Sequence, residues 1–367
     1  MKFGVFYEIQ VPRPWHERSD YDAYQEVLAQ VEYAEEMGFD YFFTVEHHFL
    51  HEYSHCSAPE VLYGALSQRT KRIRIGHGVR LLPTPYNHPI RVAEQAAVLD
   101  LLSNGRLEFG TGRSTSRLEL EGFGIPPNET RDRWEESLRI IGKIWQTPLD
   151  KEFSWEGRYF KIPPRYIVPR PLQKPHPGMW LASSGPETHE VAGQFGLGLL
   201  SFTLLVSQED LAKRIGLYHS ALKHAEPAGA FVNNQSATFA LAHCAETTAQ
   251  ARQEAKESFE WYARKAFEYV GSVLQWTQEL GGGKAMATYE YMQKMLYVDL
   301  TKATYEWMRD GDMVLSGDPE MCLKQARAYQ QSGTEVLLCH LQTYKIPHAQ
   351  VMESIRLLGK HVIPHFK

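Results

Sequence analysis

The sequence predicts an α/β fold, and within that class a closed (β/α)8 barrel, the TIM barrel, with insertions. Short apolar runs alternate with helical patterns from the first residue onward, and the links between them are short. That alternation indicates a parallel sheet with helices outside it. Eight strands are expected, each followed by a helix, and this number favours a closed barrel over an open doubly wound sheet. Residues 1–367 are therefore assigned to a single domain.

The expected strands are short apolar runs bounded by turn residues. They lie at 3–7, 39–45, 73–82, 107–110, 179–182, 197–202, 238–242 and 335–338. The expected helices show apolar residues at helical spacing, and two of them end at Gly38 and at Asn104-Gly105. They cover 24–34, 59–68, 92–102, 131–145, 186–195, 209–223, a segment after 242, 317–331 and 349–361.

Two segments break this rhythm and are predicted to be insertions. Residues 147–177 are predicted to form a hairpin, with Glu156-Gly157 at its turn, followed by a Pro-rich stretch. Residues 259–310 are rich in aromatic residues, contain a glycine triplet at 281–283, and are predicted to be helical. This second insertion is either extra packing or a dimer contact, or a mobile lid over an apolar pocket, since long insertions in barrels often cover active sites.

Composition excludes several classes of protein. The net charge is −5, from 39 Lys and Arg against 44 Asp and Glu, and there is no long basic run, so no nucleic-acid partner is expected. No apolar stretch is long enough to span a membrane, and the first residues do not resemble a signal peptide, so a cytoplasmic protein is expected. The cysteines, Cys56, Cys244, Cys322 and Cys339, lie far apart, which argues against a disulfide framework or a thiolate zinc site.

A histidine-rich segment follows the second expected strand. Within it, residues 51–55 match the zinc motif H-E-x-x-H, which requires a helix that presents both histidines on one face. A strand ends only a few residues upstream and Pro59 interrupts the segment downstream, so we interpret His51 and His55 as residues without chemistry and expect no metal. A zinc hydrolase stays as a minor alternative.

Glu46, His47 and His48 stand directly after that strand. The carboxyl-terminal rim of a barrel is where catalytic groups collect. A buried carboxylate beside two imidazoles can set a tautomer and hold a base near neutral pH. These three residues are the candidate catalytic residues.

Two further strand ends predict an anion site. After the fourth strand, Gly110-Thr111-Gly112-Arg113 opens into a loop where backbone amides and Arg113 can meet an anion; the alternative is a tight turn with a solvated arginine. After the fifth strand, Ser183, Ser184 and Gly185 precede a helix that contains Thr188 in its first turn. Free N–H groups at a helix start favour a phosphate, although these residues can also form an ordinary N-cap. Two such sites on one rim indicate one phosphorylated cofactor.

Together these segments resemble the bacterial luciferase family of flavin monooxygenases, the alkanal monooxygenase type. The similar stretches are MKFGVF at the start, Gly38-Phe39-Asp40, Glu46-His47-His48-Phe49, 75–83, 88–94, 99–106 and Phe109-Gly110. The resemblance is specific over residues 1–120 and weaker after residue 200.

The resemblance implies roles for single residues. It assigns His47 to the histidine that supports the peroxyflavin chemistry, Arg113 to the FMN phosphate, and Ser184 to a second phosphate loop. It places a non-prolyl cis peptide, lying against the flavin ring, at Gly78-Val79. Phe202 stands where the luciferase light-emitting chain has a tryptophan.

This chain also departs from the luciferases. Gly112 replaces the luciferase reactive cysteine, and Tyr86 and Asn87 lengthen the loop after Pro83. These departures argue against light emission and long-chain aldehyde substrates.

The function implied is that of an FMN-dependent monooxygenase. It takes externally reduced FMN and O₂ and transfers one oxygen atom to a small organic substrate through a flavin hydroperoxide. A separate flavin reductase and a homodimer are also implied. The alternative within the same fold is a deazaflavin-dependent oxidoreductase that transfers hydride; a flavin-binding protein without catalysis is a further alternative.

Overall fold

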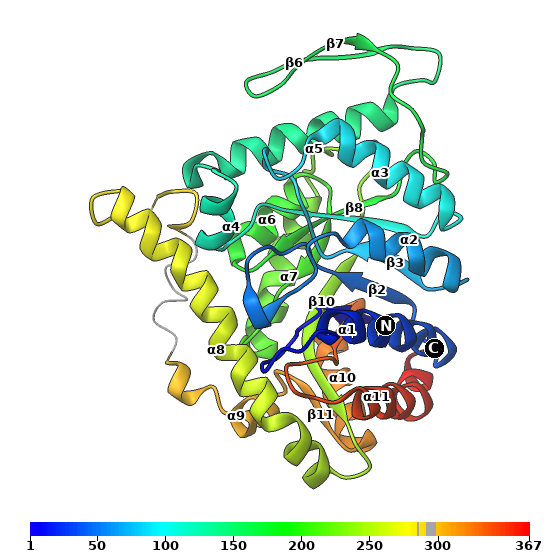
Figure 1. Cartoon of the computed structure of the whole chain (residues 1–367), viewed down its shortest axis with the longest axis vertical. Coiled ribbons are helices and arrows are strands. Elements are labelled where there is room, and N and C mark those ends of the chain that lie inside the picture. Colours follow the sequence, from blue (N-terminus) through cyan, green and yellow to red (C-terminus); the bar gives the residue numbers. More distant parts are fainter. Residues whose placement is uncertain (285, 291–298) are drawn as a thin grey trace.

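The computed structural model describes residues 1–284, 286–290 and 299–367. Eight parallel strands form a closed ring, which confirms the predicted barrel (Figure 1). Each strand pairs with the next, and the last pairs with the first. In ring order they are β1 (Lys2–Tyr7), β2 (Tyr41–Thr44), β3 (Arg74–His77), β5 (Leu107–Gly112), β8 (Gly178–Ser183), β9 (Gly198–Ser201), β10 (Ser236–Cys244) and β12 (Val336–His340).

Helices surround this ring, and capping residues fix where several of them begin. The side chains of Thr247 and Asp318 accept the first free backbone N–H groups of α8 and α10. Pro89 and Pro186 occupy first helical positions, where no N–H is needed. The helices are α1 (Ser19–Glu36), α2 (Pro59–Arg69), α3 (Pro89–Leu102), α4 (Arg117–Gly122), α5 (Thr130–Gln146), α6 (Pro186–Gln194), α7 (Gln208–Leu222), α8 (Thr248–Leu280), α9 (Tyr305–Asp310), α10 (Pro319–Gln331) and α11 (His348–His361), with 3₁₀ turns at His51–Tyr53, Pro127–Glu129, Leu300–Lys302 and Ile363–Phe366.

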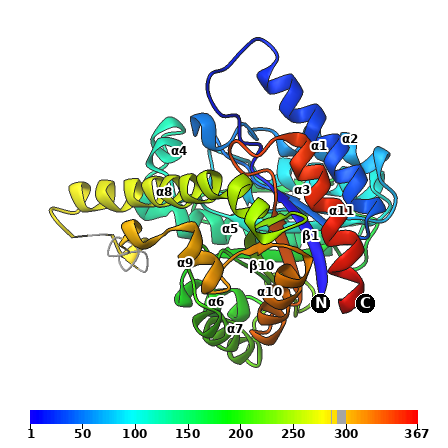
Figure 2. The same ribbon diagram turned by 90° about the horizontal axis from the view of Figure 1, so that it is seen from below.

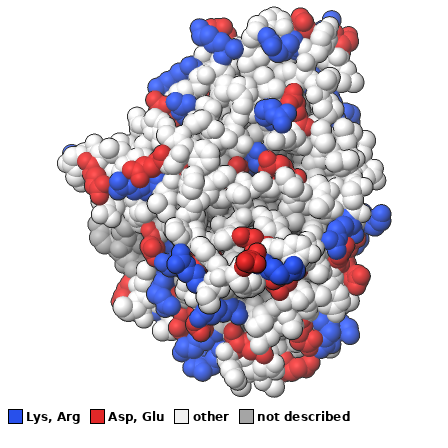
Figure 3. Space-filling model, viewed as in Figure 1, with Lys and Arg blue, Asp and Glu red and all other residues white. Residues whose placement is uncertain are grey.

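The main core lies inside the ring and between the ring and its helices, because the ring strands are almost wholly buried. Both views place the two chain ends side by side (Figures 1 and 2), and the rings of Phe3 and Phe366 pack edge to face at 5.3 Å. The face seen in Figure 3 carries basic and acidic side chains interspersed, with uncharged areas between them. Within the described residues, no helix is both long enough and apolar enough to cross a membrane.

Two corrections concern the third predicted strand and the helix predicted from residue 317. The strand expected at 73–82 is two pieces, β3 and β4 (Arg80–Leu81), because the chain turns at Gly78–Val79 between them. The helix expected from residue 317 begins at Pro319, because residues Leu315–Gly317 form a strand, β11, along the end of β10.

The segment at 147–177 contains the antiparallel pair β6 (Phe153–Glu156) and β7 (Lys161–Arg165). This pair lies outside the barrel, beyond α5 (Figure 1).

The aromatic segment at 259–310 begins inside α8, so it extends a crossover helix and has no separate start. The far half of α8 packs its Val273 and Leu274 against Leu120 of α4 and against Tyr289. Residues 285 and 291–298 of this predicted insertion lie outside the described residues.

Candidate active site

A cavity of about 660 Å³ lies at the carboxyl-terminal ends of the strands. Its volume is in the range of small-molecule and cofactor sites. Ten of the predicted site residues line it: Glu46, His47, Gly78, Val79, Gly112, Arg113, Ser183, Ser184, Thr188 and Phe202. His48 and Gly185 are not among the lining residues. The barrel thus brings together residues from five strand ends that are far apart in the sequence.

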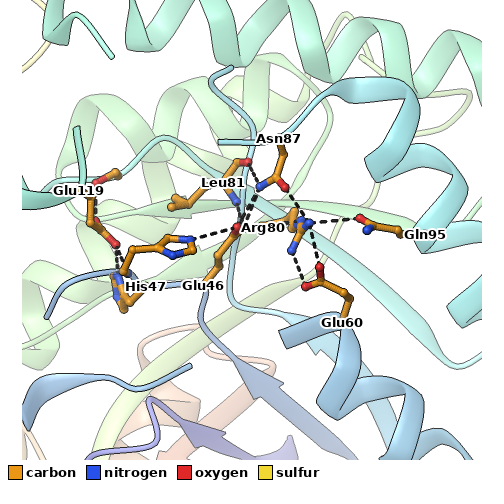
Figure 4. Close-up of polar contacts among 10 residues, drawn as sticks. Glu46, His47, Glu60, Arg80, Leu81, Asn87, Gln95 and Glu119 are labelled. Atoms are coloured by element: carbon orange, nitrogen blue, oxygen red, sulfur yellow. Dashed lines mark hydrogen bonds and ion pairs between the residues drawn. The ribbon is translucent and has the colours of Figure 1, made fainter. Parts of the chain in front are cut away.

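His47 is held by a carboxylate that the sequence did not reveal. Its Nδ1 lies 2.9 Å from Oε1 of Glu119, a fully buried residue of α4 (Figure 4). The same carboxylate accepts hydrogen bonds from the backbone N–H of His48 at 3.0 Å and from Ser114 Oγ at 2.6 Å. A carboxylate at Nδ1 keeps the proton on that nitrogen in the neutral ring, which leaves Nε2 as the acceptor.

The pKa of His47 is raised. Burial alone lowers it, but the negative charge of Glu119 and its hydrogen bond, followed by the charges of Glu8 and Glu46, outweigh that effect. His47 is therefore a fixed imidazole that can hold a proton near neutral pH inside a cavity.

Glu46 has a different environment, because both of its oxygens are occupied. Its Oε2 accepts the backbone N–H of Leu81 at 2.8 Å, and its Oε1 accepts Asn87 Nδ2 at 2.9 Å (Figure 4). Burial raises the pKa of this carboxyl, but hydrogen bonds from His48, Leu81 and Asn87 and the charge of Arg80 lower it below the ordinary value. Glu46 is accordingly an ionised carboxylate that ties β2 to β4.

Arg80 completes this network from the other side. Its guanidinium pairs with Glu60 at 2.7 Å and donates to Asn87 at 2.7 Å and to Gln95 at 3.1 Å (Figure 4). Asn87 stands in the lengthened loop after Pro83, so that loop fixes the position of Glu46.

His48 points into this network and is packed among aromatic rings. Its Nε2 lies 3.4 Å from Glu46 Oε1, and its ring packs against those of Tyr86 and Phe123. These contacts indicate a supporting position beside the cavity.

One end of the cavity suits an anion. Arg113 and Arg131 both line it, together with Thr115 and Ser116. Ser116 is buried, and its Oγ has no hydrogen-bond partner among the described residues. Arg113 donates to the backbone oxygen of Thr288 at 3.2 Å. Two cations and a hydroxyl without a partner match a phosphate group.

The loop before α6 contributes to the same end. Ser183 Oγ donates to the backbone oxygen of Thr188 at 3.0 Å, and Thr188 Oγ1 accepts the N–H of Gly185 at 3.2 Å. Buried His189 fixes the loop from below, with Nδ1 2.7 Å from the Gly185 oxygen and Nε2 2.7 Å from Ser201 Oγ. Gly185, which does not line the cavity, holds this loop through its backbone N–H and carbonyl oxygen.

The middle of the cavity is apolar and closely fitted. The peptide bond between Gly78 and Val79 is cis, as the resemblance implied. A Cβ on Gly112 would lie 2.5 Å from Val79 Cγ2, so that a cysteine at this position would require Val79 to move. Leu81, Leu181 and Leu200 line the same region.

The zinc motif does not form the helix it needs. Residues His51–Tyr53 make one 3₁₀ turn, and His51 is exposed. His55 Nδ1 pairs with Asp20 at 2.5 Å, and Glu52 accepts the backbone N–H of Arg13. The two histidines therefore do not share a helical face.

Sequence reasoning missed three polar residues of the site, Glu8, Glu119 and Arg131. Glu119 stands in a short helix of mixed polarity and Arg131 among charged residues at the start of α5, so both had the pattern of solvent-exposed positions. Glu8 offered a weak signal, because it follows the run of apolar residues in β1.

Comparisons with known proteins identify the family of this chain. A family model described as luciferase-like monooxygenase matches residues 1–335. The chain is 28% identical over 223 residues to the oxygenase component of the flavin-dependent trigonelline monooxygenase of Acinetobacter baylyi, a match that covers 60% of this chain and only 59% of that relative. It is 28% identical over 377 residues to limonene 1,2-monooxygenase of Rhodococcus erythropolis, covering 99% of this chain and 86% of that one.

A solved structure and a further relative are named with two different cofactors, FMN and F420. The oxygenating constituent of 3,6-diketocamphane monooxygenase from Pseudomonas putida, solved with FMN, has the same fold, with a TM-score of 0.75 at 19% identity over 99% of this chain and 98% of that one. The F420-dependent glucose-6-phosphate dehydrogenase of Amycolatopsis mediterranei is 27% identical over 323 residues, covering 84% of this chain and 87% of that one.

Proposed function

The chain belongs to the luciferase-like monooxygenase family, and we propose that it uses externally reduced FMN and O₂ to transfer one oxygen atom to a small organic substrate. The observation that carries this proposal is that one cavity contains an anion-binding end, a close-fitting apolar middle and a fixed imidazole, His47. Its relatives include named flavin-dependent monooxygenases.

The residues present fit FMN. Arg113 and Arg131 carry the charge that a phosphate needs, and the buried hydroxyl of Ser116 is an available donor. Ser183, Ser184 and Thr188 supply further hydroxyls at the start of α6. The apolar middle, from Gly78 and Val79 to Phe202, suits a flat aromatic ring system.

When bound in its reduced form, FMN supplies the reaction with O₂. The apolar walls exclude water, which protects reactive species from hydrolysis. His47 holds or passes a proton through Nε2, while Glu119 fixes the ring from the other nitrogen. We assign Glu46 and His48 to positioning, because their polar atoms face each other and β4.

The deazaflavin alternative keeps the same site. F420-dependent relatives support it, and an arginine-lined anion end would suit any flavin-type cofactor with a phosphate. The relatives that are named as flavin monooxygenases favour FMN.

A separate reductase completes the proposal, because the trigonelline relative is named as an oxygenase component. We also propose a homodimer through α2 and α3, which pack side by side and expose Val61, Val98, Leu101 and Leu102. The segment after α8 is proposed as a lid, because Thr288 contacts Arg113 and Ala287 lines the cavity. The four cysteines are buried and unpaired, which suits a reducing cytoplasm.

The test uses FMN reduced chemically, then O₂ and a panel of small organic compounds, with oxygenated product and hydrogen peroxide measured in the same sample. The parent should give product, and His47→Ala should bind FMN but lose about 10²–10⁴-fold in product rate and release peroxide. His51→Ala and His55→Ala, whose side chains take no part in the cavity, are the matched controls. Reduction of F420 without oxygen consumption would favour the alternative.

A further inference from the structure

Glu8 lines the cavity, and the proposed flavin chemistry does not use it. It follows β1 directly, and only 3% of its surface is exposed. A buried carboxyl in a binding cavity requires an explanation, because burying a charge without a partner costs free energy.

The groups around this carboxyl are hydrogen-bond donors. Tyr262 Oη of α8 donates to Oε1 at 2.9 Å, and Gln10 Nε2 donates to Oε2 at 3.2 Å. The Gln10 amide cannot turn over without loss, because its Oε1 accepts the backbone N–H of Tyr344 at 2.5 Å. An all-donor environment favours the ionised form, which accepts further hydrogen bonds and donates none.

His47 is the basic side chain whose charge lowers the pKa of Glu8. Across residues 1–284, 286–290 and 299–367, Glu8 forms no ion pair with a lysine or arginine. The arginines that line the cavity, Arg113 and Arg131, lie at the anion end described above. When His47 is neutral, Glu8 therefore leaves a negative charge in the cavity wall that a bound cation can balance.

The cavity wall near Glu8 is aromatic. Phe6, Tyr53 and Tyr269 line the cavity. The ring of Tyr53 stacks on that of Tyr262 at 5.3 Å and meets that of Tyr269 edge to face at 5.2 Å. Aromatic faces beside a carboxylate attract organic cations, because the ring faces are negative.

We propose that Glu8, with the rings of Tyr53 and Tyr269, binds the ammonium group of an amine substrate. This inference rests on the proposed monooxygenase function and adds the substrate class to it. It separates the cavity into an anion end for the cofactor phosphate and a cation subsite for the organic substrate.

The charge state of Glu8 makes this subsite depend on pH. The pKa of Glu8 is raised to about 7, because the effect of burial exceeds the lowering effects of the His47 charge and of hydrogen bonds from Tyr262, Tyr53 and Gln10. The titratable groups that face it are His47 after β2, Tyr53 and Cys56 in the following segment, and Tyr262 on α8. A bound cation lowers this pKa, so amine binding releases protons and strengthens about ten-fold between pH 6 and pH 8.

The experiment is a calorimetric titration of the full chain, saturated with FMN, with pairs of ligands. Each pair consists of an ammonium compound and an alcohol of similar shape. Benzylammonium is compared with benzyl alcohol, cyclohexylmethylammonium with cyclohexylmethanol, and butylammonium with butanol. The parent should prefer at least one ammonium probe over its alcohol by about ten- to a hundred-fold at pH 8, the range expected for a charge-assisted hydrogen bond. Glu8→Gln should abolish that preference while its FMN affinity stays unchanged.

Matched variants keep the proposal falsifiable. Glu257→Gln removes an exposed carboxylate of α8, which pairs with Lys345 outside the cavity, and should behave as the parent. Tyr269→Leu removes one ring face and should weaken ammonium binding alone, which tests the subsite even where Glu8→Gln fails to fold. The proposal is overturned if no ammonium probe binds better than its alcohol, or if Glu8→Gln keeps the preference. Loss of FMN affinity in Glu8→Gln with the amine preference intact would assign Glu8 to the flavin instead. If the parent does not bind FMN, the proposed function is contradicted, whereas the comparison of ammonium and alcohol binding is still valid.

Discussion

The contact between Glu119 and His47 leads to a prediction about the proton affinity of His47. Glu119→Gln removes the negative charge but keeps the shape, with the amide oxygen toward His47 and the amide nitrogen toward Ser114. In the parent, that charge lies 2.9 Å from Nδ1 and is the largest influence that raises the pKa of His47. An opposite charge at such a distance stabilises the protonated ring. The pKa of His47 should therefore fall in Glu119→Gln, and the proton should leave at lower pH.

The measurement is a nuclear magnetic resonance titration of protein labelled with ¹⁵N-histidine, in parallel with the pH profile of product yield. Both curves should move to lower pH in Glu119→Gln. The control is Glu121→Gln, an exposed residue of the same helix that pairs with Arg117. Equal His47 titration curves in the parent and in Glu119→Gln would refute the argument that Glu119 sets this proton.

The same linkage affects stability. The folded-state pKa of His47 is raised above the ordinary value of 6.5, so its contribution is present below pH 6.5 and is lost as pH rises through the raised value. Urea unfolding of Glu119→Gln should show a weaker loss of stability over that window than the parent.

Three further predictions concern the cofactor, the barrel and the segment after α8. Arg113→Ala should weaken FMN binding about ten- to a hundred-fold by fluorescence titration, with an unchanged affinity contradicting the phosphate assignment. Gly110→Ala should prevent stable folding, because its Cβ would lie 1.9 Å from the backbone oxygen of His77. The control is Gly216→Ala in α7, whose Cβ would meet nothing within 4 Å and which should stabilise the protein by about 0.5–1 kcal/mol in thermal unfolding. A normally folded Gly110→Ala protein would show that the strands are farther apart. Limited proteolysis should cut first around Gly281–Lys284 and slow when FMN is added, and cleavage confined to other loops would count against the proposed lid.

The barrel was predictable because each of its strands carries a local signal. The apolar runs at 3–7 and 335–338, for example, are each recognisable as strands from their own residues, and the total of eight such runs predicts the closed ring. The break in the third strand was implied only by the resemblance, since nothing in the apolar pattern of 73–82 marks it. The hydrophobic pattern of a segment indicates which of its residues are buried, but it does not indicate where the backbone changes direction.

The site was predictable where a polar residue ends a strand, as at His47 and Arg113. It was not predictable where the partner comes from a helix distant in sequence. Glu119 is 72 residues from His47, and Tyr262 is 254 residues from Glu8. No local pattern links such pairs, because the tertiary fold alone brings them together.

One face of helix α8 determines the shape of part of the cavity. Tyr262, Ala266, Tyr269 and Val270 recur at helical spacing, so one stripe of a single helix touches Glu8 and lines the cavity. The anion end is built from the ends of β5 and β8 and from Arg131 of α5, which are other parts of the chain. A few substitutions along that stripe can therefore reshape the part of the cavity beside Glu8 while the residues of the anion end stay the same.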